Sequence, residues 1–316
     1  MSNSPRLESL NNFQFHQSPQ IQRVEHKLLK QRSVELSVLR LDALDQYLGG
    51  NKWFKLQAYL RDARSLGYTR LLSFGGAWSN HLYALAAAGK RFGFSTLGIV
   101  RGERPTNLNP LLTDLQGMGM QLVFVSRSEY RRRGDVAYVD QLRAQFSPCY
   151  VIPEGGASAL GVQGAANMLP VSLRNAYDVF ALACGSGTSA AGLISVLPGS
   201  AQVCGFSVMK DRGTLQQAVT TMVPNAQASW CIESRFAGAG FARASSELVQ
   251  FMDAFSASTG IPLEPVYTGK LFMGLFTMIV QGDFATGTRL LALHTGGLQG
   301  LRGMQTVLIK LRAGMS

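Results

Sequence analysis

The stretch ALACGSGTSAAG, residues 181–192, joins an apolar run to an alanine-rich run through a loop of glycine and hydroxyl residues. The apolar run is typical of a buried strand, and the alanine-rich run is typical of a helix. Small residues let the backbone approach a phosphate, and the free N–H groups at the helix start point toward the anion. The stretch therefore predicts a strand, an anion-binding loop and a helix.

Three interpretations of this loop are open. The loop can hold a single phosphate between Gly185 and Gly187, with hydroxyl donors from Ser186 and Thr188. It also fits the dinucleotide fingerprint G-x-G-x-x-A, with Asp211 as the carboxylate for a ribose. The third interpretation is a tight turn without a ligand. Because the loop lies beyond the middle of the chain, a cofactor with one phosphate fits best.

Helical and strand patterns alternate along the chain from about residue 52. RLLSFGG, STLGIVRG, QLVFVS and AQVCGFSV are short apolar runs, and each lies next to a stretch with helical spacing. This alternation predicts βαβ units and a parallel sheet. A break near PEGG, residues 153–156, indicates a crossing between two α/β lobes.

Composition limits the class of protein. The 316 residues are 46% hydrophobic and 16% charged, as expected for a globular enzyme. The net charge of +11 is scattered, and its one dense cluster, residues 131–133, is interpreted as a solvated helix face. We therefore expect no nucleic-acid partner, whereas a small anionic substrate or cofactor suits the charge.

Four cysteines show no CxxC pair and no metal-type spacing with the four histidines. We expect reduced, mostly buried thiols and no metal site. The first twenty residues are polar and lack the apolar core of a secretion signal, which favours a cytoplasmic location. Glycines and Pro198 interrupt the long uncharged stretch after Asp178, so we expect no membrane span.

The stretch GGNKWFKL, residues 49–56, places Lys52 at the start of an amphipathic helix. The helix dipole disfavours a cation there, lowers the lysine pKa and favours the neutral amine that forms imines. The ordinary alternative is a solvated lysine after a Gly-Gly turn. Together with a loop for one phosphate, a reactive lysine is what pyridoxal phosphate (PLP) requires.

Six segments occur in this order along the chain: GGNKWFKL, GGAWSNHLYALAAAGKRFG, PEGGASALGVQGA, GSGT, YTGK and HTGGLQGL. With these segments in this order, the chain from about residue 40 resembles the 1-aminocyclopropane-1-carboxylate (ACC) deaminase and D-cysteine desulfhydrase family, which consists of fold-type II, tryptophan-synthase-β-like PLP enzymes. The resemblance implies an α/β fold with two open, twisted, mostly parallel sheets and flanking helices. It also implies a large PLP-binding domain (residues 1–53 and 161–316), a small domain (residues 54–160) and a homodimer.

The resemblance further implies catalytic and substrate-binding roles. Lys52 is expected to form the Schiff base with PLP and to remove the substrate's Cα proton. Ser79 is expected to bind the substrate carboxylate or transfer a proton, and Tyr267 to lie against cofactor and substrate. Asn80 and His81 complete the expected substrate contacts.

The expected cofactor ligands also have ordinary structural alternatives. Asn80 is expected to bind the cofactor's 3′-oxygen and Thr295 its pyridine nitrogen. However, Ser79 and Asn80 also suit a helix N-cap, Tyr267 a core position and Thr295 a turn. The expected phosphate ligands are Gly185, Ser186, Gly187 and Thr188.

Two positions separate the family's activities. ACC deaminases have Glu and Leu where this chain has Thr268 and Thr295, the pair that resembles desulfhydrases. The resemblance thus implies elimination from a D-amino acid such as D-cysteine. ACC deamination or another PLP-dependent deamination is the alternative, and an NAD(P)-dependent oxidoreductase is the alternative outside the family. Trp78, Leu82 and Tyr83 depart from the desulfhydrase pattern, which has Gln before the Ser and Val-Arg after the His.

Overall fold

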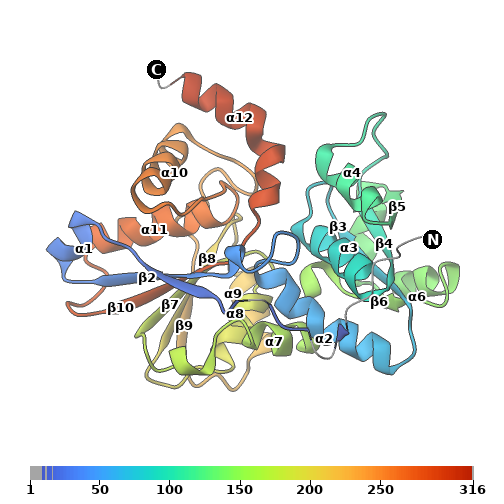
Figure 1. Cartoon of the computed structure of the whole chain (residues 1–316), viewed down its shortest axis with the longest axis horizontal. Helices are drawn as coiled ribbons and strands as arrows, with labels where there is room; N and C mark the ends of the chain where they lie inside the picture. Colours follow the sequence, from blue (N-terminus) through green and yellow to red (C-terminus); the bar gives the residue numbers. More distant parts are fainter. Residues whose placement is uncertain (1–8, 11–12, 16, 315–316) are drawn as a thin grey trace.

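The computed structural model describes residues 9–10, 13–15 and 17–314. It contains two sheets, each flanked by helices (Figure 1). We call the six-stranded sheet (order β1-β2-β10-β7-β8-β9) with its helices the large lobe, and the four-stranded sheet (order β5-β4-β3-β6) with its helices the small lobe. Among the strand pairings of the described residues, only β1–β2 is antiparallel. The predicted α/β fold with two mostly parallel sheets is confirmed.

The large sheet is covered on both faces, which explains why its central strands are apolar throughout. All six residues of β7 are buried, for example. Helices α7, α8 and α9 lie on one face, and α1, α10 and α11 lie on the other. The strands are β1 (Gln20–Arg23), β2 (Glu35–Arg40), β7 (Val179–Cys184), β8 (Gln202–Ser207), β9 (Ser229–Glu233) and β10 (Arg289–His294). The helices are α1 (Lys27–Arg32), α7 (Ala159–Ala166), α8 (Thr188–Ile194), α9 (Thr214–Met222), α10 (Ser246–Thr259), α11 (Thr268–Gln281) and α12 (Leu301–Ala313).

The small lobe follows the same βαβ logic. Helix α3 begins at a Ser79 cap and ends at Gly93, whose φ of 74° suits the left-handed C-cap. The strands are β3 (Arg70–Gly75), β4 (Ser95–Arg101), β5 (Met120–Val125) and β6 (Tyr150–Val151). The helices are α3 (Asn80–Phe92), α4 (Pro110–Gly117), α5 (Arg127–Tyr130) and α6 (Val136–Gln145). Short 3₁₀ turns in the chain are η2 (Leu41–Ala43), η3 (Arg131–Gly134), η4 (Glu154–Gly156), η5 (Val171–Leu173) and η6 (Leu298–Gly300).

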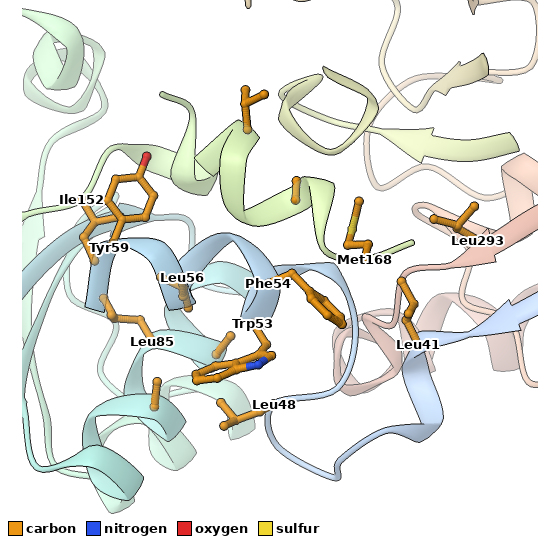
Figure 2. Close-up of a cluster of buried hydrophobic side chains, with 14 of the residues drawn as sticks. Leu41, Leu48, Trp53, Phe54, Leu56, Tyr59, Leu85, Ile152, Met168 and Leu293 are labelled. Atoms are coloured by element: carbon orange, nitrogen blue, oxygen red, sulfur yellow. The ribbon is translucent and has the colours of Figure 1, made fainter. Parts of the chain in front are cut away.

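Helix α2 (Asn51–Ser65) joins the two lobes through one continuous core. Figure 2 shows Trp53, Phe54 and Leu56 of α2 among side chains from both sides. Leu41 and Leu293 come from the large lobe, whereas Leu85 and Ile152 come from the small lobe. The predicted domain boundary at residues 53 and 54 falls inside this helix and stays a prediction.

Glycines in α7 and α8 allow α2, α7 and α8 to pack backbone against backbone. A methyl group on Gly164 would lie 2.3 Å from the carbonyl oxygen of Phe54. A methyl group on Gly192 of α8 would lie 2.5 Å from Cβ of Ala165. No side chain fits at either position, so Gly164 of the GVQGA segment and Gly192 together fix the position of α2 relative to the large sheet.

Several composition-based expectations can be compared with this fold. Arg132 lies near Asp135, and Arg133 pairs with Glu154, as expected for a solvated charged face.

Within the described ranges, no helix has the length and apolarity needed to cross a membrane. The N-terminal stretch used to judge secretion lies largely outside the described residues. The predicted free, mostly buried thiols are confirmed for Cys149, Cys184 and Cys204, with Cys231 half-buried.

Candidate active site

The carboxyl ends of three adjacent parallel strands bring the large-lobe motifs together. Strands β2, β10 and β7 are neighbours, and they are followed by Lys52, Thr295 and Gly185, respectively. Asn51 links the three segments. Its backbone N–H donates to the carbonyl of Thr295 (3.2 Å), and its side-chain amide donates to Oγ of Ser189 (2.8 Å). This edge is where open α/β sheets bind ligands.

Lys52 lies in the first turn of α2, and its Nζ donates to Oδ1 of Asn51 at 2.9 Å. The same Nζ lies 5.8 Å from the centroid of the Tyr267 ring. Burial lowers the pKa of Lys52 from 10.5 to about 8, and the negative charge of Glu264 partly opposes this shift. The predicted fall in the pKa of Lys52 is confirmed, but its main cause is desolvation and not the helix dipole that the sequence suggested.

The glycine loop lies between β7 and α8, as predicted. Gly187 has a φ of 78°, which favours glycine, and α8 begins at Thr188. The hydroxyls of Ser186 and Thr188 are 3.0 Å apart. A methyl group on Gly185 would lie 3.5 Å from Cε1 of Tyr267, so this ring flanks both the loop and Lys52.

Lys55 is a site residue that the sequence reasoning missed. It is 2% exposed, and its Nζ donates to the carbonyl of Gly155 at 2.5 Å. A methyl group on Gly155 would lie 3.4 Å from Oγ of Ser186, which places Lys55 near the glycine loop. Burial lowers the pKa of Lys55 well below its ordinary value, and the charge of Lys52 adds to the effect. The available signal was its spacing of three residues from Lys52, on the same helix face.

Ser79 and Asn80 follow β3 of the small lobe. The Ser79 hydroxyl accepts a hydrogen bond from the backbone N–H of Leu82 at 3.2 Å, so its N-cap role is confirmed. This hydroxyl still has its own proton to donate. Nδ2 of Asn80 would lie 2.9 Å from a methyl group on Gly297, and its Oδ1 is buried without a hydrogen-bond partner. Asn80 therefore reaches the segment after β10 and has a free acceptor there.

His81 lies in the interior. Its Nε2 is 2.9 Å from Oγ of Ser73, and its Nδ1 is buried without a partner. Burial lowers the pKa of His81 well below its ordinary value, with contributions from the charges of Lys55 and Lys52. A neutral imidazole is therefore expected, and its role toward a substrate stays a prediction.

Glu264 is the second site residue that the sequence reasoning missed. It is 2% exposed and accepts backbone N–H bonds from Val266 (2.8 Å), Tyr267 (2.7 Å) and Thr268 (2.7 Å). Burial raises the pKa of Glu264, whereas these hydrogen bonds favour its ionised form. Glu264 therefore provides a buried carboxylate near Lys52, although the chain has Thr268 where ACC deaminases have Glu.

Two other charged residues have structural roles. Lys270 of the YTGK motif is 1% exposed and donates to three backbone carbonyls, those of Val208, Ala237 and Gly240, at 2.6 to 3.1 Å. Asp211 accepts from the backbone N–H of Leu215 at 3.0 Å and from the hydroxyl of Thr214. The carboxylate that the dinucleotide interpretation assigns to a ribose is therefore bonded to the first turn of α9.

The arrangement fits PLP on several independent grounds. Lys52 supplies an amine that loses its proton easily, and the glycine loop with buried Lys55 offers hydrogen-bond donors for one phosphate. Asn80 has an unsatisfied buried acceptor near Gly297 and Gly300, in the segment after β10. The family model "Pyridoxal-phosphate dependent enzyme" matches residues 25–296. Fold and site thus define a PLP-dependent enzyme of fold type II.

Within that class, the chain belongs to the ACC deaminase and D-cysteine desulfhydrase family. A Thermotoga maritima protein named "Putative 1-aminocyclopropane-1-carboxylate deaminase" is 32% identical over 83% of this chain and 89% of its own length. A mitochondrial protein of Arabidopsis thaliana, named a bifunctional D-cysteine desulfhydrase/ACC deaminase, is 30% identical over 84% of this chain and 73% of its own length.

A solved structure supports the fold. The crystal structure of an ACC deaminase homologue superposes with a TM-score of 0.78 over 94% of each chain, at 24% identity. Together with the family match, this removes the NAD(P)-dependent oxidoreductase as an alternative.

Proposed function

We propose that the chain is a lyase of the D-cysteine desulfhydrase type, which catalyses α,β-elimination from D-cysteine or a close analogue. The overall reaction converts D-cysteine and water to pyruvate, ammonia and hydrogen sulfide. The observation that carries this choice is the Thr268 and Thr295 pair, found where ACC deaminases have Glu and Leu. Thr268 is fully buried, and its hydroxyl is bonded to Glu264 (3.3 Å), so it brings no charge of its own into the site.

Lys52 is the proposed base for the substrate's Cα proton. A base is most effective when its pKa lies near the working pH, and the pKa of about 8 satisfies this condition. The hydrogen bond from Nζ to Asn51 fixes the direction of the amine. PLP, when bound, supplies an electron-withdrawing ring that accepts the electron pair left at Cα.

Tyr267 is the proposed acid for the leaving sulfur. Burial raises its pKa, and the charges of Glu264 and Glu154 add to this shift, so the hydroxyl keeps its proton at neutral pH. The ring lies beside both Lys52 and the glycine loop. The released enamine then hydrolyses to pyruvate and ammonia in water.

The remaining residues are proposed to bind and orient. Ser79 would donate its hydroxyl proton to the substrate carboxylate, with Asn80 and His81 close by. The negative charge of a bound phosphate would favour the protonated form of Lys55, which would then join the phosphate ligands. The cofactor ligands proposed are Lys52, Asn80, Gly185, Ser186, Gly187, Thr188 and Thr295.

An amino-acid panel tests the proposal. The purified protein is incubated with D- and L-cysteine, D- and L-serine and ACC, and pyruvate, 2-oxobutyrate, ammonia and sulfide are measured. We expect equal amounts of pyruvate, ammonia and sulfide from D-cysteine, and none from Lys52→Ala. The exposed Lys90→Ala is the matched control and should retain full activity.

The ACC deaminase alternative gives a different result in the same panel. It predicts 2-oxobutyrate and ammonia from ACC without sulfide from D-cysteine, which would overturn the desulfhydrase proposal. Homodimer formation and a cytoplasmic location stay predictions, and sedimentation velocity tests the first of them.

A further inference from the structure

Three glycines spaced three residues apart, Gly297, Gly300 and Gly303, lead from the end of β10 into α12, and side chains of the small lobe lie on them. Asn80 lies over the first two: Nδ2 is 2.9 Å from a methyl group placed on Gly297, and Oδ1 is 3.6 Å from one on Gly300. The indole of Trp78 lies over the third. Its Cδ2, Cε2 and Cε3 would be 2.6 to 2.9 Å from a methyl group on Gly303, so only glycine fits beneath it.

Two polar contacts stabilise this arrangement. Nδ2 of Asn109, the N-cap of α4, donates to the carbonyl of Ala77 at 3.0 Å and fixes the loop that carries Trp78. Arg302 of α12 pairs with Asp114 of α4 at 2.6 Å. The loop before α3, helix α4 and the start of α12 are therefore connected on one side of the junction between the lobes (Figure 1).

The position of Trp78 follows from this row of contacts. Asn80 lies at the Gly297 end, next to the segment of Thr295, and Trp78 lies at the Gly303 end. Trp78 is also 36% exposed, so one side of the indole is in contact with solvent while the other covers α12. The indole thus lies over the first turn of α12, farther from Thr295 than Asn80 does. In the chain, Trp78 comes directly before Ser79.

We propose that Trp78 is a specificity-determining residue, whose indole closes the solvent side of the substrate site and restricts it to amino acids with short side chains. This inference rests on the proposed location of the substrate at Ser79 and Asn80. A substrate with a longer side chain must displace the indole from Gly303, and it loses the apolar contact between the lobes. D-cysteine, with a single atom beyond Cβ, leaves the contact intact.

The test compares substrates of increasing size on the PLP-loaded enzyme. D-cysteine, S-methyl-D-cysteine and S-benzyl-D-cysteine all give pyruvate, with release of sulfide or the corresponding thiol. We expect Trp78→Ala to raise the kcat/KM for the benzyl substrate relative to D-cysteine by about tenfold or more, the range of a pocket wall. Trp78→Phe should give a smaller change. A purely structural role would lower both values together and leave the ratio unchanged.

Gly303→Ala provides an independent variant, because its methyl group must displace the unmodified indole. It should relax the size preference in the same direction as Trp78→Ala. Gly117→Ala is the matched control, since Gly117 lies in α4 with no neighbouring atom within 4 Å of an added methyl group, and it should keep the wild-type ratio.

A fluorescence measurement tests the contact without turnover. Acrylamide quenching is measured for the wild type and for Trp78→Phe, and the difference between them reports the accessibility of Trp78. The same difference, measured with Gly303→Ala present in both proteins, should be larger. Unchanged quenching would overturn the contact, and an unchanged size ratio would overturn the specificity role.

The outcome for Trp78 can be separated from that for the proposed reaction. If the enzyme uses a different amino acid, the size ratio is measured on the side-chain homologues of that amino acid. If no amino acid is turned over, the dissociation constants of the amino acids replace kcat/KM. These constants are measured from changes in the yellow absorbance. The proposed elimination can thus fail while Trp78 still sets the size limit, and a ratio unaffected by Trp78→Ala refutes the inference in each case.

Discussion

The pKa of Lys52 makes the protonation state of this amine the sharpest test of the site. A lysine of pKa about 8 is about one-tenth neutral at pH 7. With the ordinary pKa of 10.5, the neutral fraction would be roughly 300-fold smaller, because the difference of 2.5 pH units is a factor of 10^2.5. Since only the neutral amine condenses with an aldehyde, this difference appears directly in the rate of cofactor capture.

The perturbation is Glu264→Gln, which removes the buried negative charge that raises the pKa of Lys52. The apoenzyme is mixed with PLP between pH 6 and 10, and the growth of the yellow band is followed by stopped-flow absorbance. In the wild type, the rate should rise about tenfold per pH unit and level off near pH 8. In Glu264→Gln, the midpoint should move below pH 8, because the protonated amine has lost a stabilising charge.

Glu247→Gln is the matched control, since Glu247 is an exposed carboxylate in the first turn of α10. Its midpoint should equal that of the wild type. A wild-type midpoint near 10.5 would refute the claim that burial controls Lys52, and an upward shift in Glu264→Gln would refute the role assigned to the Glu264 charge.

Three further substitutions have defined outcomes. Lys52→Ala should eliminate the yellow absorbance while the exposed Lys90→Ala retains it; a yellow Lys52→Ala protein would assign the cofactor to another lysine. Lys55→Met should raise the PLP dissociation constant about 10- to 100-fold, because a charge-assisted contact to the phosphate contributes roughly 1.5–3 kcal/mol. Equilibrium dialysis measures the dissociation constant, and an unchanged value excludes the contact. Lys270→Met should lower the free energy of unfolding by about 3 kcal/mol, because three carbonyls lose their donor. Urea denaturation checks this, with exposed Lys210→Met as the neutral reference.

Much of the fold was predictable because each strand and helix leaves a local pattern. The apolar run of β7, the glycine loop and the start of α8 were expected at the residues where they occur. Lys52 and Thr295 were also placed at the ends of elements. Their proximity depends on the strand order β2-β10-β7, in which β10 pairs with residues about 250 (β2) and about 110 (β7) positions away in the chain. Local patterns contain no information on that order.

The missed residues share a physical reason. Lys55 and Glu264 are charged, and in the sequence alone each resembles an ordinary surface residue. Burial by distant segments gives them their properties: Gly155 accepts from Lys55, and the turn before α11 encloses Glu264. The available signal for Lys55 was its helical spacing from Lys52, and the signal for Glu264 was a carboxylate shortly before a helix start.

The continuous core around α2 affects how the molecule opens. Because side chains of α2 pack against both lobes, the small lobe cannot unfold locally without exposing the helix that carries Lys52. The most protected amides of α2 should therefore exchange with deuterium only through opening of the whole molecule, together with those of β7 and β3. A protease-resistant fragment consisting of the six-stranded sheet alone would contain no ordered Lys52, so the capacity to capture PLP should disappear in the same transition as the global fold.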